Sequence, residues 1–81
     1  MATKAYVLIE TEVGKVKEIS DALRKLPCIK AVDTVTGPYD IIAVAEGVDL
    51  NAIGELITAG IHPIPNITRT VTCLTIRTVT P

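Results

Sequence analysis

The stretch Val35-Thr36-Gly37-Pro38-Tyr39-Asp40-Ile41-Ile42 decides the fold, because it places a tight reversal between two apolar segments. Pro38 presets the backbone angle φ of the first central turn position, and Gly37 accepts conformations that other residues avoid. The stretch therefore predicts a β-hairpin. A phenol and a carboxylate, from Tyr39 and Asp40, follow the turn directly, so polar groups are expected at the end of an otherwise apolar sheet.

Outward from the hairpin, the spacing of apolar residues predicts six elements. Helices are indicated where apolar residues recur every three or four positions, and strands where short apolar runs lie between turn residues. Pro27 ends the first helix, and Asp49 is placed as the N-cap of the second. The expected strands cover residues 4–10, 29–36, 40–46 and 68–79, and the expected helices cover residues 14–26 and 50–61.

This order, β-α-β-β-α-β, is that of the ferredoxin-like α+β fold. Right-handed crossovers put both helices on one face of a four-stranded antiparallel sheet, with the strands in the spatial order fourth, first, third, second. With 81 residues, the chain is expected to form one domain over residues 1–81.

The sheet face away from the helices is also expected to be apolar, whereas a bare sheet face in water normally carries polar residues. In the two central strands, Ala5, Val7 and Ile9 oppose Tyr6 and Leu8, and Ile41, Ala43 and Ala45 oppose Ile42 and Val44. Apolar surface of this kind marks an interface. We therefore expect a homodimer packed sheet against sheet, which can assemble further into a ring. The alternative is that loops or the C-terminal tail cover this face.

Composition and charge exclude several classes of protein. The net charge is −1 and the Lys and Arg residues are scattered, so direct binding to nucleic acid is not expected. No apolar run is long enough for a signal segment or a membrane span, which predicts a cytoplasmic protein. Cys28 and Cys73 lie far apart without a CxxC pair. Two free thiols are the simpler expectation, although the sequence leaves their oxidation open.

The sequence indicates no catalytic, metal or cofactor site. Asp33, Asp40 and Glu46 lie around a turn, without the cleft that a catalytic pair of carboxylates needs. His62 is the single histidine and has no Cys-His spacing to support a metal ligand or a nucleophile. The glycines are isolated, so no nucleotide-binding loop is present. We expect a protein that is not an enzyme.

The hairpin is the best candidate for binding a small molecule. Its carboxylate, phenol and exposed backbone N–H groups suit a free amino acid, whose ammonium needs an acceptor and whose carboxylate needs donors. The last expected strand adds Arg69 and the hydroxyls of Thr68, Thr70 and Thr72. The alternative is a simple turn, in which Tyr39 packs and Asp40 accepts hydrogen bonds from local amides.

The chain resembles the effector domain of the Lrp/AsnC family of feast/famine regulators, also called the regulation-of-amino-acid-metabolism domain. The resemblance is carried by Tyr6-Val7-Leu8-Ile9-Glu10-Thr11, Gly14-Lys15-Val16, Val35-Thr36-Gly37-Pro38-Tyr39-Asp40 and Thr68-Arg69-Thr70-Val71-Thr72, and it covers essentially the whole chain. It implies dimers that form through the sheets and associate into octamers or related rings, with effectors bound near the interfaces. The family's N-terminal helix-turn-helix is lacking, so the chain looks like a stand-alone form of the domain.

The resemblance also implies a set of ligand-binding residues. Four match the family's hairpin motif and two lie on the strand that contributes to its effector pocket: Thr36, Gly37, Tyr39 and Asp40, then Thr70 and Thr72. The segment His62-Pro63-Ile64-Pro65-Asn66 departs from the more usual Ser-Ile-Pro-Gly type of turn, and the role of Arg69 stays open.

We therefore expect an effector-sensing domain for transcription regulation. It would bind an amino acid or a related metabolite at a protomer interface, act through oligomer assembly, and be able to modulate full-length regulators of the same family. The alternatives are a ligand-independent oligomeric scaffold and a small dimeric ferredoxin-like enzyme. The sequence does not determine the effector, the number of subunits or the partner regulator.

Overall fold

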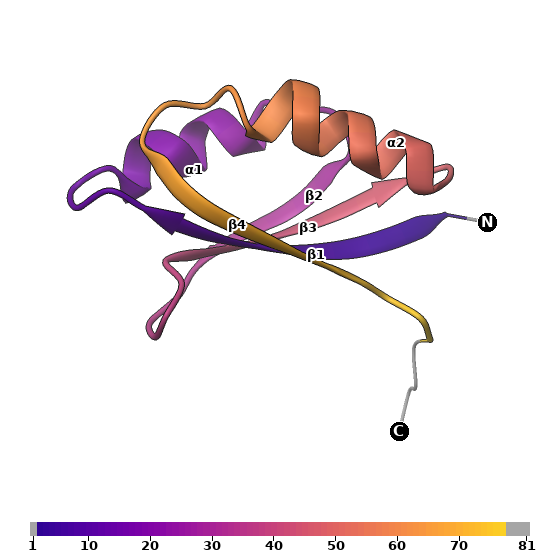
Figure 1. The fold of residues 1–81 in the computed structure, drawn as a ribbon, viewed down its shortest axis with the longest axis horizontal. Helices are drawn as coiled ribbons and strands as arrows, with labels where there is room; N and C mark the ends of the chain where they lie inside the picture. The colour runs from indigo at the N-terminus through magenta and orange to yellow at the C-terminus, as the bar shows by residue number, and fades with distance from the viewer. Residues whose placement is uncertain (1, 78–81) are drawn as a thin grey trace.

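A four-stranded antiparallel sheet with helices on one face forms the molecule (Figure 1). The structure, a computed structural model, describes residues 2–77. The strands lie in the order β2-β3-β1-β4, which confirms the predicted ferredoxin-like arrangement. The elements are β1 (Thr3–Thr11), α1 (Val16–Arg24), β2 (Ile29–Thr34), β3 (Ile41–Gly47), α2 (Leu50–Glu55), the π-helix η1 (Leu56–Ile61) and β4 (Ile67–Leu74).

The core lies between the sheet and the helices, and side-chain alternation along the two central strands builds it. Every second residue of β3 and of the middle of β1 is buried there, and the helices add large aliphatic side chains. The buried residues are Ala5, Val7, Ile9, Ile41, Ala43 and Ala45 from the strands, with Ile19, Leu23, Ile53, Leu56 and Ile61 from the helices. The predicted alternation of both central strands is therefore confirmed, and the structure shows which of the two sets faces the helices.

The helix ends are set by local chemistry. The Asp49 side chain accepts a hydrogen bond from the backbone N–H of Ala52 at 2.9 Å, which confirms the predicted N-cap of α2. At the other helix, α1 begins at Val16 rather than at residue 14, because Gly14 has a φ of +81° that a right-handed helix excludes. Helix α1 ends at Arg24, three residues before Pro27.

The second helix is not regular along its length, which differs from the prediction of one α-helix over 50–61. From Leu56 to Ile61 it widens into a π-helix, and the His62 N–H donates to the Ile57 carbonyl, five residues back, at 2.8 Å. Gly60 lies in this widened turn and packs close to Leu26 of the neighbouring segment.

All four strands have bounds other than those predicted, and β1 extends one residue further at each end, over Thr3–Thr11 instead of 4–10. Strand β2 ends at Thr34, so residues 35 and 36 belong to the connection, and β3 runs from Ile41 through Gly47 instead of 40–46. Strand β4 ends at Leu74. The predicted extension to residue 79 is wrong as far as residue 77, and residues 78 and 79 lie outside the described part. Within residues 2–77, the helices are all too short or too polar to cross a membrane.

Candidate functional site

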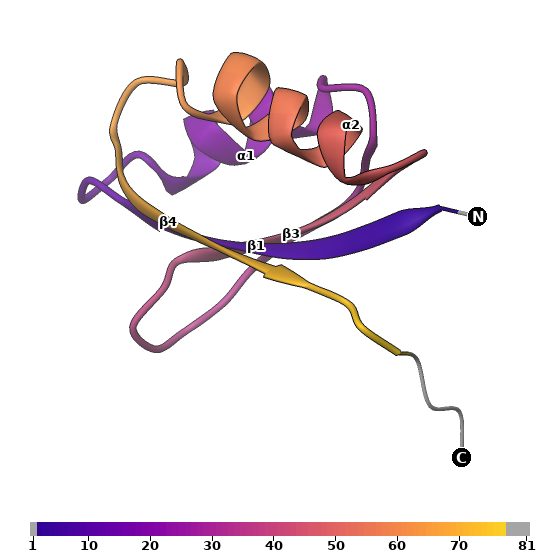
Figure 2. The same ribbon diagram turned by 45° about the vertical axis from the view of Figure 1, so that its right-hand side comes forward.

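The connection between β2 and β3 forms one wall of the candidate site. It bends away from the helices, to the open side of the sheet (Figure 2). Gly37 has a φ of +120°, a conformation that favours glycine, and the Val35 N–H donates to the Asp40 carbonyl at 2.9 Å to close the loop. The predicted reversal is therefore present, with Thr36 and Gly37 exposed at its tip.

Asp40 fixes this loop to the end of β1. Its carboxylate oxygen Oδ2 accepts hydrogen bonds from the backbone N–H of Thr11 at 2.9 Å and from the Thr11 hydroxyl at 3.4 Å. Its own backbone N–H donates to the Ile9 carbonyl at 2.9 Å. Asp40 is half-buried, and one of its two carboxylate oxygens holds the loop in place. The loop therefore presents its polar groups from an anchored frame rather than from a free tip.

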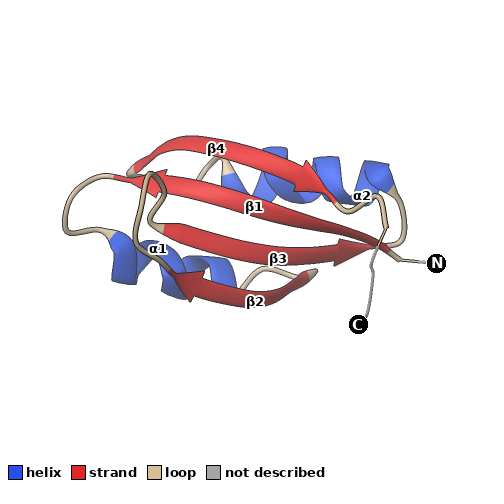
Figure 3. Ribbon diagram, turned by 90° about the horizontal axis from the view of Figure 1, so that it is seen from below, coloured by secondary structure: helices blue, strands red, loops and turns tan. Residues whose placement is uncertain are grey.

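Tyr39 and Arg69 lie together on the open side of the sheet. The guanidinium carbon of Arg69 lies 5.6 Å from the centroid of the Tyr39 ring, within the range of a cation–π contact. Figure 3 looks onto this side and shows the connection curling from β2 across the end of β1 towards β4. The contact thus links the loop to the edge strand.

Glu10 and Thr68 complete a polar cluster at this end of the sheet. The Thr68 hydroxyl lies 2.9 Å from Glu10 Oε1 and 3.1 Å from the Glu10 carbonyl oxygen. Glu10 also faces Arg69 across the β1–β4 pairing. We refer below to Glu10, Thr11, Tyr39, Asp40, Thr68 and Arg69 as the polar cluster.

The two other predicted residues on β4 lie on a different face from Arg69. Thr70 pairs with Ile9, and Thr72 pairs with Val7, so both point to the helix side of the sheet. Thr70 is half-buried, and Thr72 is exposed because β4 is an edge strand. Within the described residues the structure brings the hairpin residue Tyr39 to Arg69 rather than to Thr70 or Thr72.

Sequence reasoning did not assign Glu10 or Thr11 to the site. Both lie at the end of β1, where nothing in their residue types distinguishes them from ordinary strand-end polar residues. The strand register could have identified them, because the antiparallel order puts the end of β1 beside both the hairpin and the start of β4. A register estimate would therefore have placed Glu10 opposite Arg69.

An apolar sheet face adjoins the polar cluster. Tyr6 and Leu8 of β1 lie on it, with Tyr6 39% exposed, and the helices leave it uncovered (Figure 3). The register adds residues of the neighbouring strands: Ile42, Val44, Val71 and Cys73. The alternative interpretation required loops or the C-terminal tail to cover this face, but the described loops leave most of it open (Figure 3). We refer to these residues as the open face.

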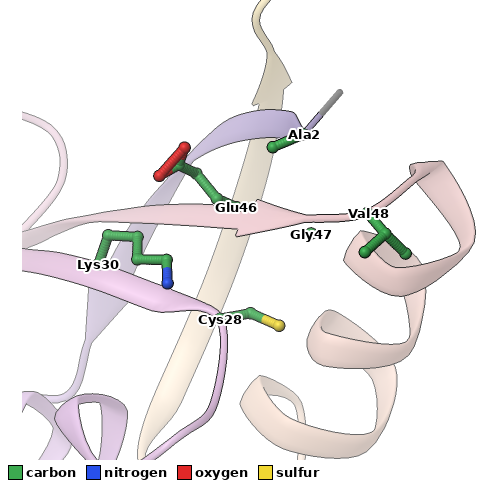
Figure 4. Close-up of a pocket in the computed structure, with 6 residues that line it drawn as sticks. All are labelled: Ala2, Cys28, Lys30, Glu46, Gly47 and Val48. Atoms are coloured by element: carbon green, nitrogen blue, oxygen red, sulfur yellow. The ribbon is translucent and has the colours of Figure 1, made fainter.

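Other cavities lie away from the hairpin. One of about 570 Å³ lies at the opposite end of the sheet, where the Glu46 carboxylate and the Cys28 thiol point in different directions (Figure 4). A second, of about 510 Å³, lies between the end of α1 and η1 and has a mostly apolar lining. Both cysteines are free. Among residues 2–77, no group of three or more His, Cys, Asp or Glu side chains could hold a metal ion.

A small cavity of about 220 Å³ borders the polar cluster. Its lining consists of His62, Ile67, Thr68, Arg69 and Thr70. Two of these residues, Thr68 and Arg69, belong to the cluster, and Thr70 is one of the predicted ligand-binding residues. The cavity therefore lies along the start of β4, beside the residues that follow η1.

Comparison with known proteins gives a consistent result. The family model described as "Lrp/AsnC ligand binding domain" matches residues 4–81. The structure is similar to TTHA0845 from Thermus thermophilus, with a TM-score of 0.92 and 32% identity over 98% of this chain and 99% of that one. It is similar to the hypothetical protein PHS023 from Pyrococcus horikoshii, with a TM-score of 0.86 and 32% identity over 96% and 93% of the two chains.

One longer protein is similar to this chain in fold but not in sequence. The transcriptional regulator NMB0573 from Neisseria meningitidis, solved as a complex with L-Met, has a TM-score of 0.87 and 15% identity. The match covers 98% of this chain and 53% of the regulator, so this chain spans about half of its length. Comparison with curated proteins gave no match.

Proposed function

We propose that this chain, which belongs to the Lrp/AsnC ligand-binding domain family, senses an amino acid or a related small metabolite at an interface between two copies of itself. Residues 1–81 would act as one ligand-binding and oligomerisation domain. Binding of the effector would favour one assembly state, and the change in assembly would report that the effector is bound. An effector shifts such an equilibrium only by its difference in affinity for the two states.

The observation that carries this proposal is the position of the polar cluster at the end of the open face. An uncovered apolar face is costly in water, so a second copy packed against it, sheet against sheet, would remove Tyr6 and Leu8 from solvent. The polar cluster would then lie at the rim of the contact. A ligand bound there could touch both copies, which couples binding to assembly.

The site would use the predicted hairpin residues. Asp40 has one carboxylate oxygen beyond its bonds to Thr11, and the same loop carries the Thr36 hydroxyl, the Gly37 N–H and the Tyr39 phenol. Thr70 lines the adjoining cavity of about 220 Å³. Thr72 lies about 10 Å along the strand from Arg69 and would reach a ligand only when a second copy brings it there.

Further assembly and partners follow from the same proposal. A ring such as an octamer, and mixed assembly with full-length regulators of the family, would let effector occupancy reach DNA without direct contact between this chain and nucleic acid. The solved complex of the Neisseria meningitidis regulator with L-Met makes a free amino acid the first effector to test. We propose no enzymatic activity, cofactor or membrane association.

Native mass spectrometry of the protein with each of the common amino acids tests this function. A dimer or ring that retains one amino acid, or changes its size with it, supports the proposal. Stable oligomers that bind none of the amino acids and do not change size would favour the scaffold alternative. A monomer at all concentrations would contradict the proposal that a second copy packs against the open face.

A matched pair of variants tests the assembly surface. Leu8→Glu puts a charge on the open face and should shift the protein towards monomer in light scattering. Leu50→Glu places the same change on a side chain that is 59% exposed at the start of α2, and it should leave the mass unchanged. Equal effects of the two changes would contradict the proposed sheet-to-sheet contact.

A further inference from the structure

We propose that Glu10 and Arg69 form a two-point site for the charged head group of a free amino acid. Arg69 would bind the α-carboxylate and Glu10 the α-ammonium. The inference rests on the function proposed above and goes beyond it, because it names the two residues that would distinguish an amino acid from a plain amine or a plain carboxylic acid.

The register places the two opposite charges side by side. Glu10 on β1 and Arg69 on β4 are direct partners in the antiparallel pairing, so both side chains leave the sheet on its open side. A direct ion pair would be the ordinary outcome of this placement. The ion pairs found within residues 2–77 instead lie on α1 and its N-cap, and none joins Glu10 to Arg69.

Neutral neighbours hold each charged group in place. The Thr68 hydroxyl donates to Glu10 Oε1 at 2.9 Å, and the Tyr39 ring lies under the Arg69 guanidinium at 5.6 Å. These contacts orient the two side chains and leave their charges without a counter-charge. Both groups are therefore preorganised for a charged ligand, which reduces the entropy lost on binding.

The remaining bonding capacity suits a zwitterion. A cation–π contact uses no N–H hydrogen bond to an acceptor oxygen, so the N–H groups of Arg69 stay available for a carboxylate in a bidentate contact. Glu10 has a second carboxylate oxygen to accept from an ammonium. An amino acid at neutral pH carries both charges on neighbouring atoms, whereas an amine or a carboxylic acid satisfies only one of the two residues.

The cavity of about 220 Å³ does not lie over this pair. Its lining includes His62 and Thr70, and Thr70 points to the helix side of the sheet, whereas the side chains of Glu10 and Arg69 leave on the open side. The two-point site therefore rests on the paired side chains and not on this cavity.

The experiment begins with the wild-type protein and the twenty common amino acids in isothermal titration calorimetry. The amino acid that binds most tightly is the probe, and its α-amide and N-acetyl derivatives are the matched ligands, since each lacks one of the two charges. Each derivative should bind at least about tenfold more weakly than the parent. This arm needs no variant, so it does not depend on the folding of a mutant.

Two variants then assign the charges to residues. Arg69→Met and Glu10→Gln should each weaken binding of the parent amino acid by about tenfold or more. In addition, Arg69→Met should lose its discrimination against the amide, and Glu10→Gln should lose its discrimination against the N-acetyl derivative. The control changes Lys25→Met and Glu12→Gln, at exposed sites outside the cluster, should alter affinity by less than about twofold.

Failure of this inference and failure of the proposed function give different results. If the wild type binds an amino acid but binds both derivatives equally well, or if the two cluster variants behave like their controls, the two-point site is wrong and the sensing function stands. If the wild type binds none of the twenty amino acids, both the two-point site and the proposed amino-acid effector are overturned.

Discussion

Replacing Asp40 by alanine should loosen the hairpin without disturbing the core. The carboxylate oxygen Oδ2 accepts from the backbone N–H and the hydroxyl of Thr11, at 2.9 and 3.4 Å. Hydrogen bonds to a charged group contribute about 1.5–3 kcal/mol each, and the half-exposed position and the long second bond place this pair at the low end. We expect the free energy of unfolding to fall by about 1.5–2 kcal/mol, mainly because the Thr11 N–H loses its partner.

Urea titration followed by circular dichroism measures this loss, at one fixed protein concentration because assembly changes the apparent stability. In thermal unfolding the same loss corresponds to a decrease in Tm of about 6–16 °C for a domain of this size. Asp40→Asn keeps a neutral acceptor for the Thr11 N–H, so its loss should be about half as large. Asp33→Ala is the matched control, because this exposed carboxylate on β2 has no side-chain hydrogen bond to any of residues 2–77.

The result that refutes this reasoning is an Asp40→Ala protein as stable as the Asp33→Ala control. The carboxylate would then not hold the hairpin to β1. Hydrogen exchange gives an independent reading at the bond itself: the Thr11 amide should exchange faster in Asp40→Ala than in the wild type, while the Ile9 amide in the buried part of the strand should keep its protection.

Three further predictions concern the elements around the core. Asp49→Ala removes the acceptor for the Ala52 N–H and should lower the free energy of unfolding by about 1 kcal/mol in urea titration. Gly47→Ala should cost about 1–3 kcal/mol in the same assay, since the new Cβ would lie 2.9 Å from the Ala52 Cβ. The pKa of Asp21 is lowered, chiefly by its hydrogen bond to Arg24. The contribution of Asp21 to stability is therefore present above the pKa of an unfolded Asp and is lost as the pH falls through the lower folded pKa. Asp21→Asn should remove that part of the pH dependence, which urea titration at a series of acidic pH values measures.

The topology could be predicted from the sequence because many apolar residues independently indicate the same elements. In β1, Ala5, Val7 and Ile9 had to share one face, and the helical spacing around Ile19 and Leu23 supplied the side chains that cover it. The order of elements then left one arrangement with right-handed crossovers. Each of these steps uses many residues, so an error of one or two positions at an element's end does not change the result.

The site could be predicted only in part, because its geometry depends on single contacts across the sheet. The hairpin tip was identified from Gly37 and Pro38, but the link from Asp40 to Thr11 joins residues that are 29 positions apart. The widening at η1 likewise depends on local backbone bonds such as that from His62 to Ile57, which no apolar spacing encodes. Thr70 and Thr72 remain predictions as ligand-binding residues.

The two cation–π contacts give this molecule an internal optical reporter. The chain has no tryptophan and two tyrosines, and each tyrosine ring lies beside a cation: Lys4 at 5.2 Å from Tyr6, and Arg69 at 5.6 Å from Tyr39. Tyr6 lies on the open face and Tyr39 in the polar cluster. In a Tyr39→Phe variant, the fluorescence of Tyr6 would follow contact between copies at the open face. In a Tyr6→Phe variant, the fluorescence of Tyr39 would follow binding of a ligand at the polar cluster. The order of the two events could then be timed without an attached label.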